Sequence, residues 1–261
     1  MHVYKNSPID DVYFHEYTKN YKVTSPTNIS LDGTVLNVFM CLRNNSNTLS
    51  STFDSLELLE TSYPHVTFCY YIFENDSTDD TPEKIKHFMF QRQGRFSCNL
   101  LKMKQWESIK SIHRSTDMAV YRNSMKSLCT DWENSIYSVI VDSNVHFNVA
   151  TIEGFIQELQ DTSIAMVTPF GHVNHMPRVY YDTYALLTFQ DKQRLPVFTP
   201  CLYEVKSAFG GIVMLRTEAL QHSRWAATPH ALYSEHVAFC SQVRQFGQVV
   251  VLKNNKVEWN P

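Results

Sequence analysis

The sequence predicts an α/β fold, with a Rossmann-like, mixed but mainly parallel twisted sheet and helices on its faces. Short apolar runs of buried-strand length alternate with segments whose apolar residues recur at helical spacing. Strand, helix and strand in that order form a parallel pair with a right-handed crossover. A chain of 261 residues suits one such domain, which buries about three quarters of its unfolded surface. Since no repeat or linker is evident, we expect a single domain over residues 34–261, after an irregular lead-in over 1–33.

Each predicted element follows from its own pattern. The apolar runs 36–42 (LNVFMCL) and 66–73 (VTFCYYIF) are strands, and four apolar residues between them share one helix face. Thr81 and Pro82 suit the cap and the first position of the next helix. The elements predicted after it are a helix over 118–128, strands over 137–141 and 164–170 with a helix over 152–159 between them, a strand over 212–216 after a proline- and aromatic-rich connection (171–206), and a helix over 235–246 that leads into a strand over 249–252.

Charge and cysteine content disfavour several classes of protein. The 23 basic and 26 acidic residues give a formal charge of −3, so no large positive field attracts nucleic acid. No stretch approaches the ~18 apolar residues of a membrane span, and the first twenty residues lack the apolar segment of a signal peptide. The six cysteines lie far apart without a CxxC pattern, which favours a reducing compartment. We therefore expect a cytoplasmic protein without a membrane span.

Polar side chains follow the first two predicted strands. Arg43 stands directly after the first strand, and the loop 74–81 after the second strand carries Glu74 and Asp76. A β-α-β unit brings both segments to one edge of the sheet, where ligands bind in open α/β sheets. Short acidic side chains can bind a nucleobase or a ribose, and an arginine can bind phosphate. The same loop is equally consistent with a solvated helix cap.

Asp142, Ser143 and Asn144 follow a later apolar strand. Two oxygen-bearing side chains at this spacing can converge on a divalent cation, whose charge stabilises a departing diphosphate. Taken alone, such a sequence is more often a turn at the end of a strand.

Two further groups lie near the end of the chain. Gly210 and Gly211 permit a close backbone approach to a ligand, although adjacent glycines also occur at a bulge or a tight strand entry. Glu235 stands at a predicted helix start, where it could take a proton from an acceptor hydroxyl, and His236 could bind metal or phosphate. A glutamate in this position often only complements the helix dipole.

In this order, the groups resemble GT-A glycosyltransferases, particularly those related to fungal capsule mannosyltransferases, procollagen sugar transferases and large-DNA-virus glycosyltransferases. The resemblance runs from about Leu36 to Leu252. The segments that carry it are IFENDSTDDT (72–81), AVYRNSM (119–125), VIVDSNVHF (139–147), YYDTYAL (180–186), VKSAFGGIVMLR (205–216) and SEHVAFC (234–240).

The resemblance implies transfer of a hexose or pentose from a UDP- or GDP-sugar to a hydroxyl of a glycan or glycoprotein. Glu74 and Asp76 would lie near the base or ribose, and the glycine pair would line the sugar and acceptor pocket. The residues expected to contact the donor are Arg43, Glu74, Asp76, Arg122, Asp142, Ser143, Gly210 and Gly211.

The resemblance also implies a metal ion and a base. Asp142 and Asn144 would hold Mn²⁺ or Mg²⁺, with His236 as a further candidate ligand. This sequence departs from the family's DxD element at Asn144, whose neutral carbonyl attracts a cation less strongly than a carboxylate. Glu235 occupies the place where an inverting relative carries its general base.

Three alternatives stay open at this point. A retaining transferase on the same fold would need no base at Glu235, and a non-catalytic module that binds nucleotide-sugars or glycans would fit the weakened Asp142 and Asn144 pair. A nucleotidyltransferase ranks lower, because it would carry a glycine-rich phosphate loop where this chain has residues 43–46, Arg-Asn-Asn-Ser.

Overall fold

The computed structural model describes residues 33–92, 97–102, 114–174, 180–195, 201–227 and 233–259. The predicted lead-in therefore lies outside the described residues apart from Gly33. In the described part of the chain, no helix has the length and apolar character that a bilayer crossing requires.

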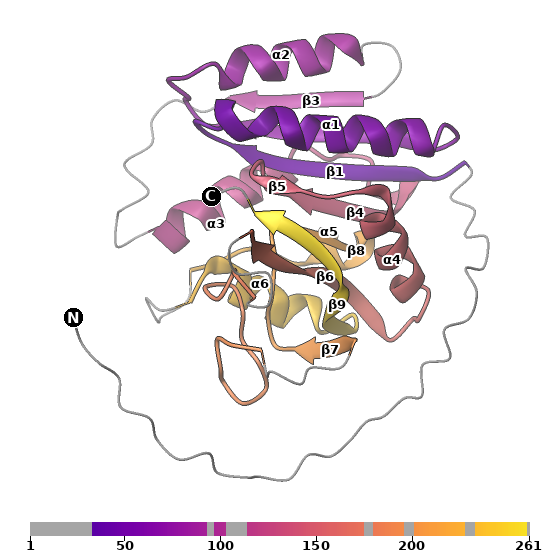
Figure 1. Cartoon of the computed structure of the whole chain (residues 1–261), viewed down its shortest axis with the longest axis vertical. Coiled ribbons are helices and arrows are strands. Elements are labelled where there is room, and N and C mark those ends of the chain that lie inside the picture. The colour runs from indigo at the N-terminus through magenta and orange to yellow at the C-terminus, as the bar shows by residue number, and fades with distance from the viewer. Residues whose placement is uncertain are drawn as a thin grey trace.

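A nine-stranded sheet runs through the described residues (Figure 1). Four strands form its parallel half in the order β3-β2-β1-β4. The sheet continues as β8-β6-β9-β5, with β7 paired to β9, and every pairing there except β6 with β9 is antiparallel. The strands are β1 (Val35–Leu42), β2 (Thr67–Glu74), β3 (Ser97–Lys102), β4 (Ser135–Val141), β5 (Val145–His146), β6 (Ile164–Val173), β7 (Leu202–Val205), β8 (Ile212–Arg216) and β9 (Gln248–Trp259).

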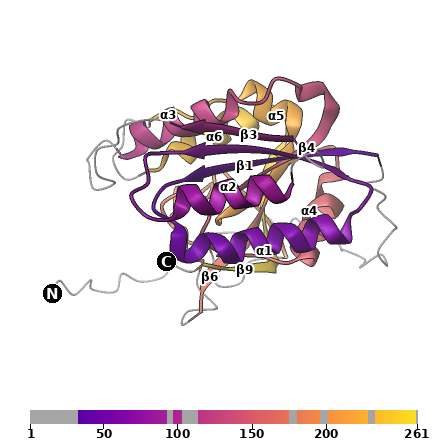
Figure 2. The ribbon, with the colours of Figure 1, turned by 90° about the horizontal axis from the view of Figure 1, so that it is seen from above.

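Helices cover both faces of this sheet (Figure 2). One layer holds α1 (Ser46–Ser62), α2 (Thr81–Gln91) and α4 (Val149–Leu159), and the other holds α3 (Arg114–Lys126), α5 (Thr217–His222) and α6 (Glu235–Val243). Alternate side chains of a strand point to opposite faces, so β1 and β2 contribute to two cores. Val38 and Met40 pack with the α1, α2 and α4 layer, whereas Phe39 packs with the other. The predicted α/β class with a mixed sheet is confirmed.

Local chemistry explains where the helices begin. At the start of α4, the Asn148 side chain accepts a hydrogen bond from the Thr151 amide, and the Ser234 hydroxyl accepts one from the His236 amide at the start of α6. The predicted start of α2 is displaced by one residue, because Asp80 is the cap and Thr81 is the first helical residue. The Thr81 hydroxyl instead accepts a hydrogen bond from the Asn45 amide at 2.8 Å, which ties the two loops together.

Several short or polar elements were not predicted from the sequence, because they leave no clear periodic pattern. They are β3, β5, β7 and α5. The last strand is also longer than expected, since it continues from Leu252 to Trp259. In its pairing with β6, Pro169 lies opposite Leu252 and Phe170 opposite Lys256, so residues 253–255 form an irregular insertion in β9. The Asn255 side chain anchors this insertion by donating a hydrogen bond to the Thr151 carbonyl at 2.7 Å.

Candidate active site

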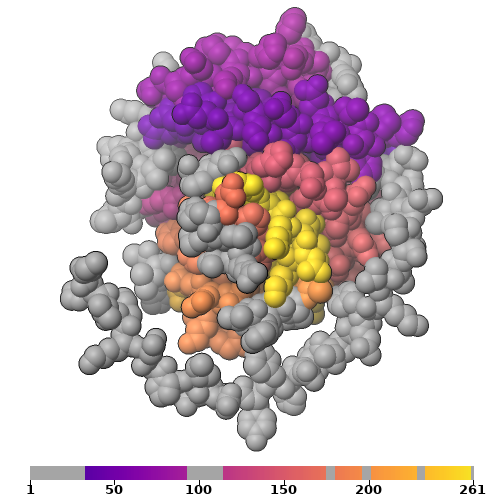
Figure 3. Space-filling view, in the orientation of Figure 1, coloured from indigo at the N-terminus to yellow at the C-terminus, as the bar shows by residue number. Residues whose placement is uncertain are grey.

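A pocket of about 610 Å³ opens where β1, β2 and β4 end and α6 begins. Its volume lies within the range of small-molecule sites. Both halves of the chain contribute to its lining, and the space-filling view shows these halves as an upper, indigo part and a lower, orange to yellow part (Figure 3). Ligands of open α/β sheets bind at this edge, so the pocket is the candidate active site.

Strand alternation explains why Asn75, and not Glu74, reaches the pocket from the end of β2. In β1 and β2, Phe39 and Phe73 face the α3 and α6 layer, and the residues at the same parity after them, Arg43 and Asn75, line the pocket. Glu74 has the opposite parity and lies outside the lining, where it accepts a hydrogen bond from the Ser77 amide at 2.7 Å. Asp76 is exposed, with φ of 50°, and also lies outside the lining.

The end of β4 is fixed by the start of β8. The Asp142 amide donates a hydrogen bond to the Gly211 carbonyl at 2.8 Å, and Asp142, Ser143 and Asn144 all line the pocket. Burial raises the pKa of the Asp142 carboxyl, the Arg122 charge lowers it, and the Glu235 charge raises it further.

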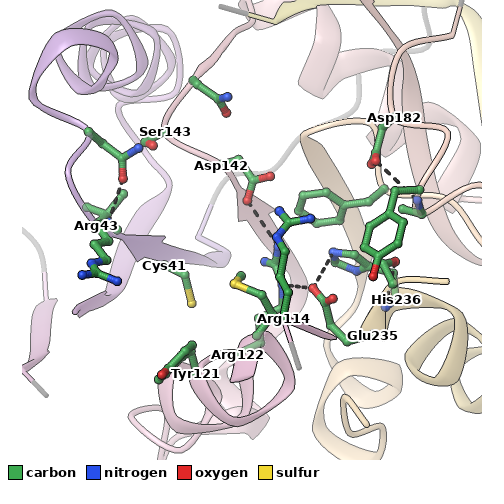
Figure 4. A pocket seen from close by; sticks show the side chains of 18 of the residues that line it. Cys41, Arg43, Arg114, Tyr121, Arg122, Asp142, Ser143, Asp182, Glu235 and His236 are labelled. Atoms are coloured by element: carbon green, nitrogen blue, oxygen red, sulfur yellow. Dashed lines mark hydrogen bonds and ion pairs between the residues drawn. The ribbon is translucent and has the colours of Figure 1, made fainter. Parts of the chain in front are cut away.

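A largely buried network of charged groups lies in the lining of the pocket (Figure 4). The Arg122 guanidinium lies 3.5 Å from Asp142 Oδ1 through Nη2 and 3.0 Å from Glu235 Oε1 through Nε. Burial alone would lower the pKa of Arg122, but Asp142 and Glu235 raise it above its usual value. Arg122 therefore stays cationic, and it has no polar partner for Nη1 among the described residues.

His236 adjoins this network of charged groups through Glu235. Its Nε2 lies 3.5 Å from Glu235 Oε1, and its ring stacks on Phe209 with 4.2 Å between centroids. Burial lowers the pKa of His236 well below its usual value, and the Arg122 charge lowers it further, so the imidazole is neutral. In the described part of the chain its Nδ1 is buried without a hydrogen bond.

The lining chemistry fits a hard divalent cation only in part. Asp142 and Asn144 supply one carboxylate and one amide oxygen, which are suitable ligand atoms. Among the described residues, no three His, Cys, Asp or Glu side chains gather closely enough to hold a metal by themselves. His236 contacts Glu235 rather than the aspartate. A cation here would therefore need oxygens from its substrate and from water.

The two predicted glycines organise the wall without lining the pocket. Gly210 and Gly211 have φ of 68° and 85°, a region that favours glycine. A Cβ on Gly211 would clash with Val145 and lie 2.8 Å from the Trp259 ring. The Gly210 carbonyl accepts a hydrogen bond from Trp259 Nε1 at 3.2 Å. The close approach to the glycine backbone that was predicted for a ligand is therefore made by this tryptophan.

Asp182 is a third carboxylate in the lining. Its oxygens accept hydrogen bonds from the Gly210 amide at 3.1 Å and the Ala185 amide at 3.4 Å. Burial raises the pKa of Asp182 to about 6, the charge of Asp142 adds to this, and the two amides oppose it. Asp182 belongs to the segment YYDTYAL that carries the resemblance, but no sequence pattern predicted a role for it.

The predicted site residues are thus divided by the structure. Those that line the pocket are Arg43, Arg122, Asp142, Ser143, Asn144, Glu235 and His236, and those outside the lining are Glu74, Asp76, Gly210 and Gly211. Of the lining residues for which no role was predicted, strand parity could have identified Asn75. Trp259 could not have been found, because nothing in the polar run before it predicts that β9 extends to the pocket.

No model of a known protein family matches the chain, and no curated protein matches its sequence. Solved structures do match. S. aureus TarS in complex with UDP is 13% identical, with a TM-score of 0.54 over 84% of this chain and 58% of that chain. The mannosyltransferase PcManGT from Pyrobaculum calidifontis, in complex with GDP-Man and Mn²⁺, is 13% identical, with a TM-score of 0.53 over 90% of this chain and 60% of that chain.

A third match is glucosyl-3-phosphoglycerate synthase from Mycobacterium tuberculosis in complex with Mn²⁺, UDP and phosphoglyceric acid. It is 11% identical, with a TM-score of 0.52 over 87% of this chain and 71% of that chain. This chain therefore spans 58% and 60% of the length of the first two matches and more of the third. The resemblance to fungal capsule mannosyltransferases, procollagen sugar transferases and large-DNA-virus glycosyltransferases stays a prediction. The chain has the GT-A fold of these glycosyltransferases.

Proposed function

We propose that this chain transfers a sugar from a nucleoside diphosphate sugar to a hydroxyl of a glycan or glycoprotein. The observation that carries the proposal is a buried cation, Arg122, held between two carboxylates in a pocket at the ligand-binding edge of a GT-A fold. Matched structures with this fold contain UDP or GDP-Man. We also keep the expectation of a cytoplasmic location as part of this proposal.

The donor base would bind near Asn75. This side chain is 2% exposed, and in the described residues neither its amide nitrogen nor its amide oxygen has a hydrogen-bond partner. An unsatisfied buried amide is costly unless a ligand completes it. A nucleobase edge offers a donor and an acceptor side by side, which an amide can match. Asn75 thus takes the place that the sequence suggested for Glu74 and Asp76.

The diphosphate would lie across the centre of the pocket. Arg122 would interact with it through the unpartnered Nη1, and Arg43 and Ser143 would contact it from the side of β1 and β4. Asp142 and Asn144 would hold Mn²⁺ or Mg²⁺, and such a cation neutralises the charge that develops on a leaving diphosphate. The remaining groups bind and orient the donor.

Glu235 would remove the proton from the acceptor hydroxyl, which makes the transfer a direct, inverting displacement. Replacing Glu235 with Gln keeps an oxygen near Arg122 but removes the base, so turnover should fall by about 100-fold or more while donor affinity is kept. Donor binding by calorimetry and transfer by product analysis would check this. A variant with wild-type turnover would remove Glu235 from the role.

One observation favours a retaining mechanism as the second candidate. Glu235 Oε1 already accepts a hydrogen bond from Arg122 Nε, so the glutamate could serve only to orient the arginine. Analysis of the product anomer by NMR separates the two mechanisms.

The basic proposal is tested by a thermal-shift screen of UDP-, GDP- and TDP-sugars with and without Mn²⁺. A ligand that binds only the folded state raises the melting temperature. If no nucleotide sugar raises it, the donor proposal is wrong. Release of nucleoside diphosphate from the bound donor then distinguishes an enzyme from a binding module.

A further inference from the structure

The two ends of the pocket carry different chemistry. In Figure 4, Arg43 and Ser143 lie at one side, Asp182 lies at the other, and Asp142 and Arg122 lie between them. The Arg43 side suits an anionic nucleotide. At the other side, no basic side chain of the described residues lies within ion-pair distance of Asp182, so a phosphate would meet an uncompensated carboxylate there.

An aromatic pair adjoins Asp182. The rings of Tyr181 and Trp259 lie 5.3 Å apart between centroids and are inclined by 56°, and both residues line the pocket. Tyr181 is 37% exposed, so its ring is available to a ligand. Trp259 is held by its hydrogen bond to the Gly210 carbonyl, and its ring fills the space that a Cβ on Gly211 would need.

The segment that carries Tyr181 and Asp182 is fixed at both ends. The Tyr181 amide donates a hydrogen bond to the Gly171 carbonyl at 2.8 Å, and the Ser234 amide donates one to the Tyr184 carbonyl at 3.2 Å. The Asp182 carboxylate accepts bonds from two backbone amides and keeps further lone pairs toward the pocket. The rings and the carboxylate are therefore positioned before any ligand arrives.

A pyranose ring matches this arrangement. Its axial C–H groups form an apolar face that can pack on an aromatic ring, and its hydroxyls at the rim donate hydrogen bonds to a carboxylate. An uncharged sugar also avoids the repulsion that a phosphate would meet. We propose that Tyr181, Asp182 and Trp259 form the acceptor subsite, which binds an uncharged pyranose with one face on the aromatic pair and a hydroxyl donating to Asp182. This inference rests on the proposed function of the pocket.

The test uses the full chain and a panel of methyl pyranosides: methyl β-D-glucoside, methyl β-D-galactoside and methyl α-D-mannoside. Saturation-transfer NMR should show that at least one of them binds, with protons of one ring face saturated most. Tyr181→Ala should raise its dissociation constant about fivefold, from the loss of one aromatic contact, whereas Tyr181→Phe should change it less than about twofold. Phe189→Ala removes an exposed aromatic side chain outside the pocket lining and is the matched control.

Two results would overturn the subsite: no pyranoside receives saturation from the wild-type protein, or Tyr181→Ala binds it as wild type does while melting at the wild-type temperature. Adding UDP-glucose or GDP-mannose, each of which fills the donor-sugar position as well as the nucleotide position, separates this failure from failure of the proposed function. If the nucleotide sugar binds without displacing the pyranoside, both proposals hold. If it displaces the pyranoside, the pyranoside occupied the donor side and the subsite is wrong. If pyranosides bind but neither nucleotide sugar does, the donor proposal fails and the subsite survives.

Discussion

The two walls of the pocket are built in different ways. On the proposed donor side, the lining residues directly follow parallel strands, and hydrogen bonds between neighbouring loops hold them, such as the bond from the Asn45 amide to Thr81 Oγ1 at 2.8 Å. On the opposite side, Asp182, Gly210 and Trp259 come from three distant segments and fix one another. The first wall comes with the β-α-β topology, whereas the second depends on particular side chains of this chain. Changes in the two walls should therefore have different consequences.

Arg122 joins the two walls, so its loss should have the largest effect. Arg122→Ala leaves Asp142 and Glu235 without their buried cation, which should cost about 3–5 kcal/mol of unfolding free energy and abolish transfer. Chemical denaturation would measure the cost. Arg216→Ala is a control, because in the described part of the chain the side chain of that arginine bonds to backbone carbonyls outside the pocket. A loss below about 1 kcal/mol for Arg122→Ala would contradict the idea that one ion-pair network unites the walls.

Gly211→Ala tests how tightly the second wall is packed. The new methyl would clash with Val145 and crowd Trp259, so we expect a loss of about 3 kcal/mol. Gly33 also has positive φ, but a Cβ at that position would have nothing within 4 Å, so Gly33→Ala should cost only about 1 kcal/mol. Equal losses in the two variants, measured by denaturant unfolding, would mean that backbone conformation and not packing sets the cost.

Asn75→Leu separates function from stability on the first wall. Since both polar atoms of the amide are buried without partners in the described residues, an apolar side chain of similar size should stabilise the ligand-free protein by about 1 kcal/mol. The same change should weaken nucleotide binding by about tenfold, because the nucleobase loses its hydrogen bonds with the Asn75 amide. Calorimetric titration and thermal melting would measure the two effects. Unchanged nucleotide affinity would exclude Asn75 from the donor site.

A further expected effect is a pH dependence of stability that comes from Asp182. Folding raises the pKa of this carboxyl from an ordinary 3.8 to about 6, so the native state binds its proton more tightly than the unfolded chain does. Its contribution to stability is therefore complete below about pH 4 and is lost as the pH rises through about 6. Urea unfolding across this range would show it. Asp182→Asn should flatten that part of the profile, and a variant with the wild-type slope would assign the slope to another group.

The difference between the walls also explains how much could be predicted from the sequence. The runs 36–42 and 66–73 predicted two parallel strands within one or two residues, because buried strands and amphipathic helices leave periodic patterns. Arg43 was predicted from the polar residues after the first run, and Asp142 from those after the strand predicted over 137–141, and both residues line the pocket. The sequence analysis proposed Glu74 and Asp76 from their charge, whereas Asn75, which lines the pocket, follows from strand parity. Tyr181, Asp182 and Trp259 meet through tertiary contacts between distant segments, which no local pattern encodes.

The irregular insertion at residues 253–255 gives the long strand β9 a second role. It lies a few residues before Trp259 in the same strand, and it sets which face of the sheet the tryptophan occupies, since side chains alternate with every residue. A single-residue deletion there would turn the indole away from the Gly210 carbonyl without touching any pocket residue. Gain or loss of residues in this loop is thus a simple route by which related chains could change the proposed acceptor subsite while the proposed nucleotide side stays intact.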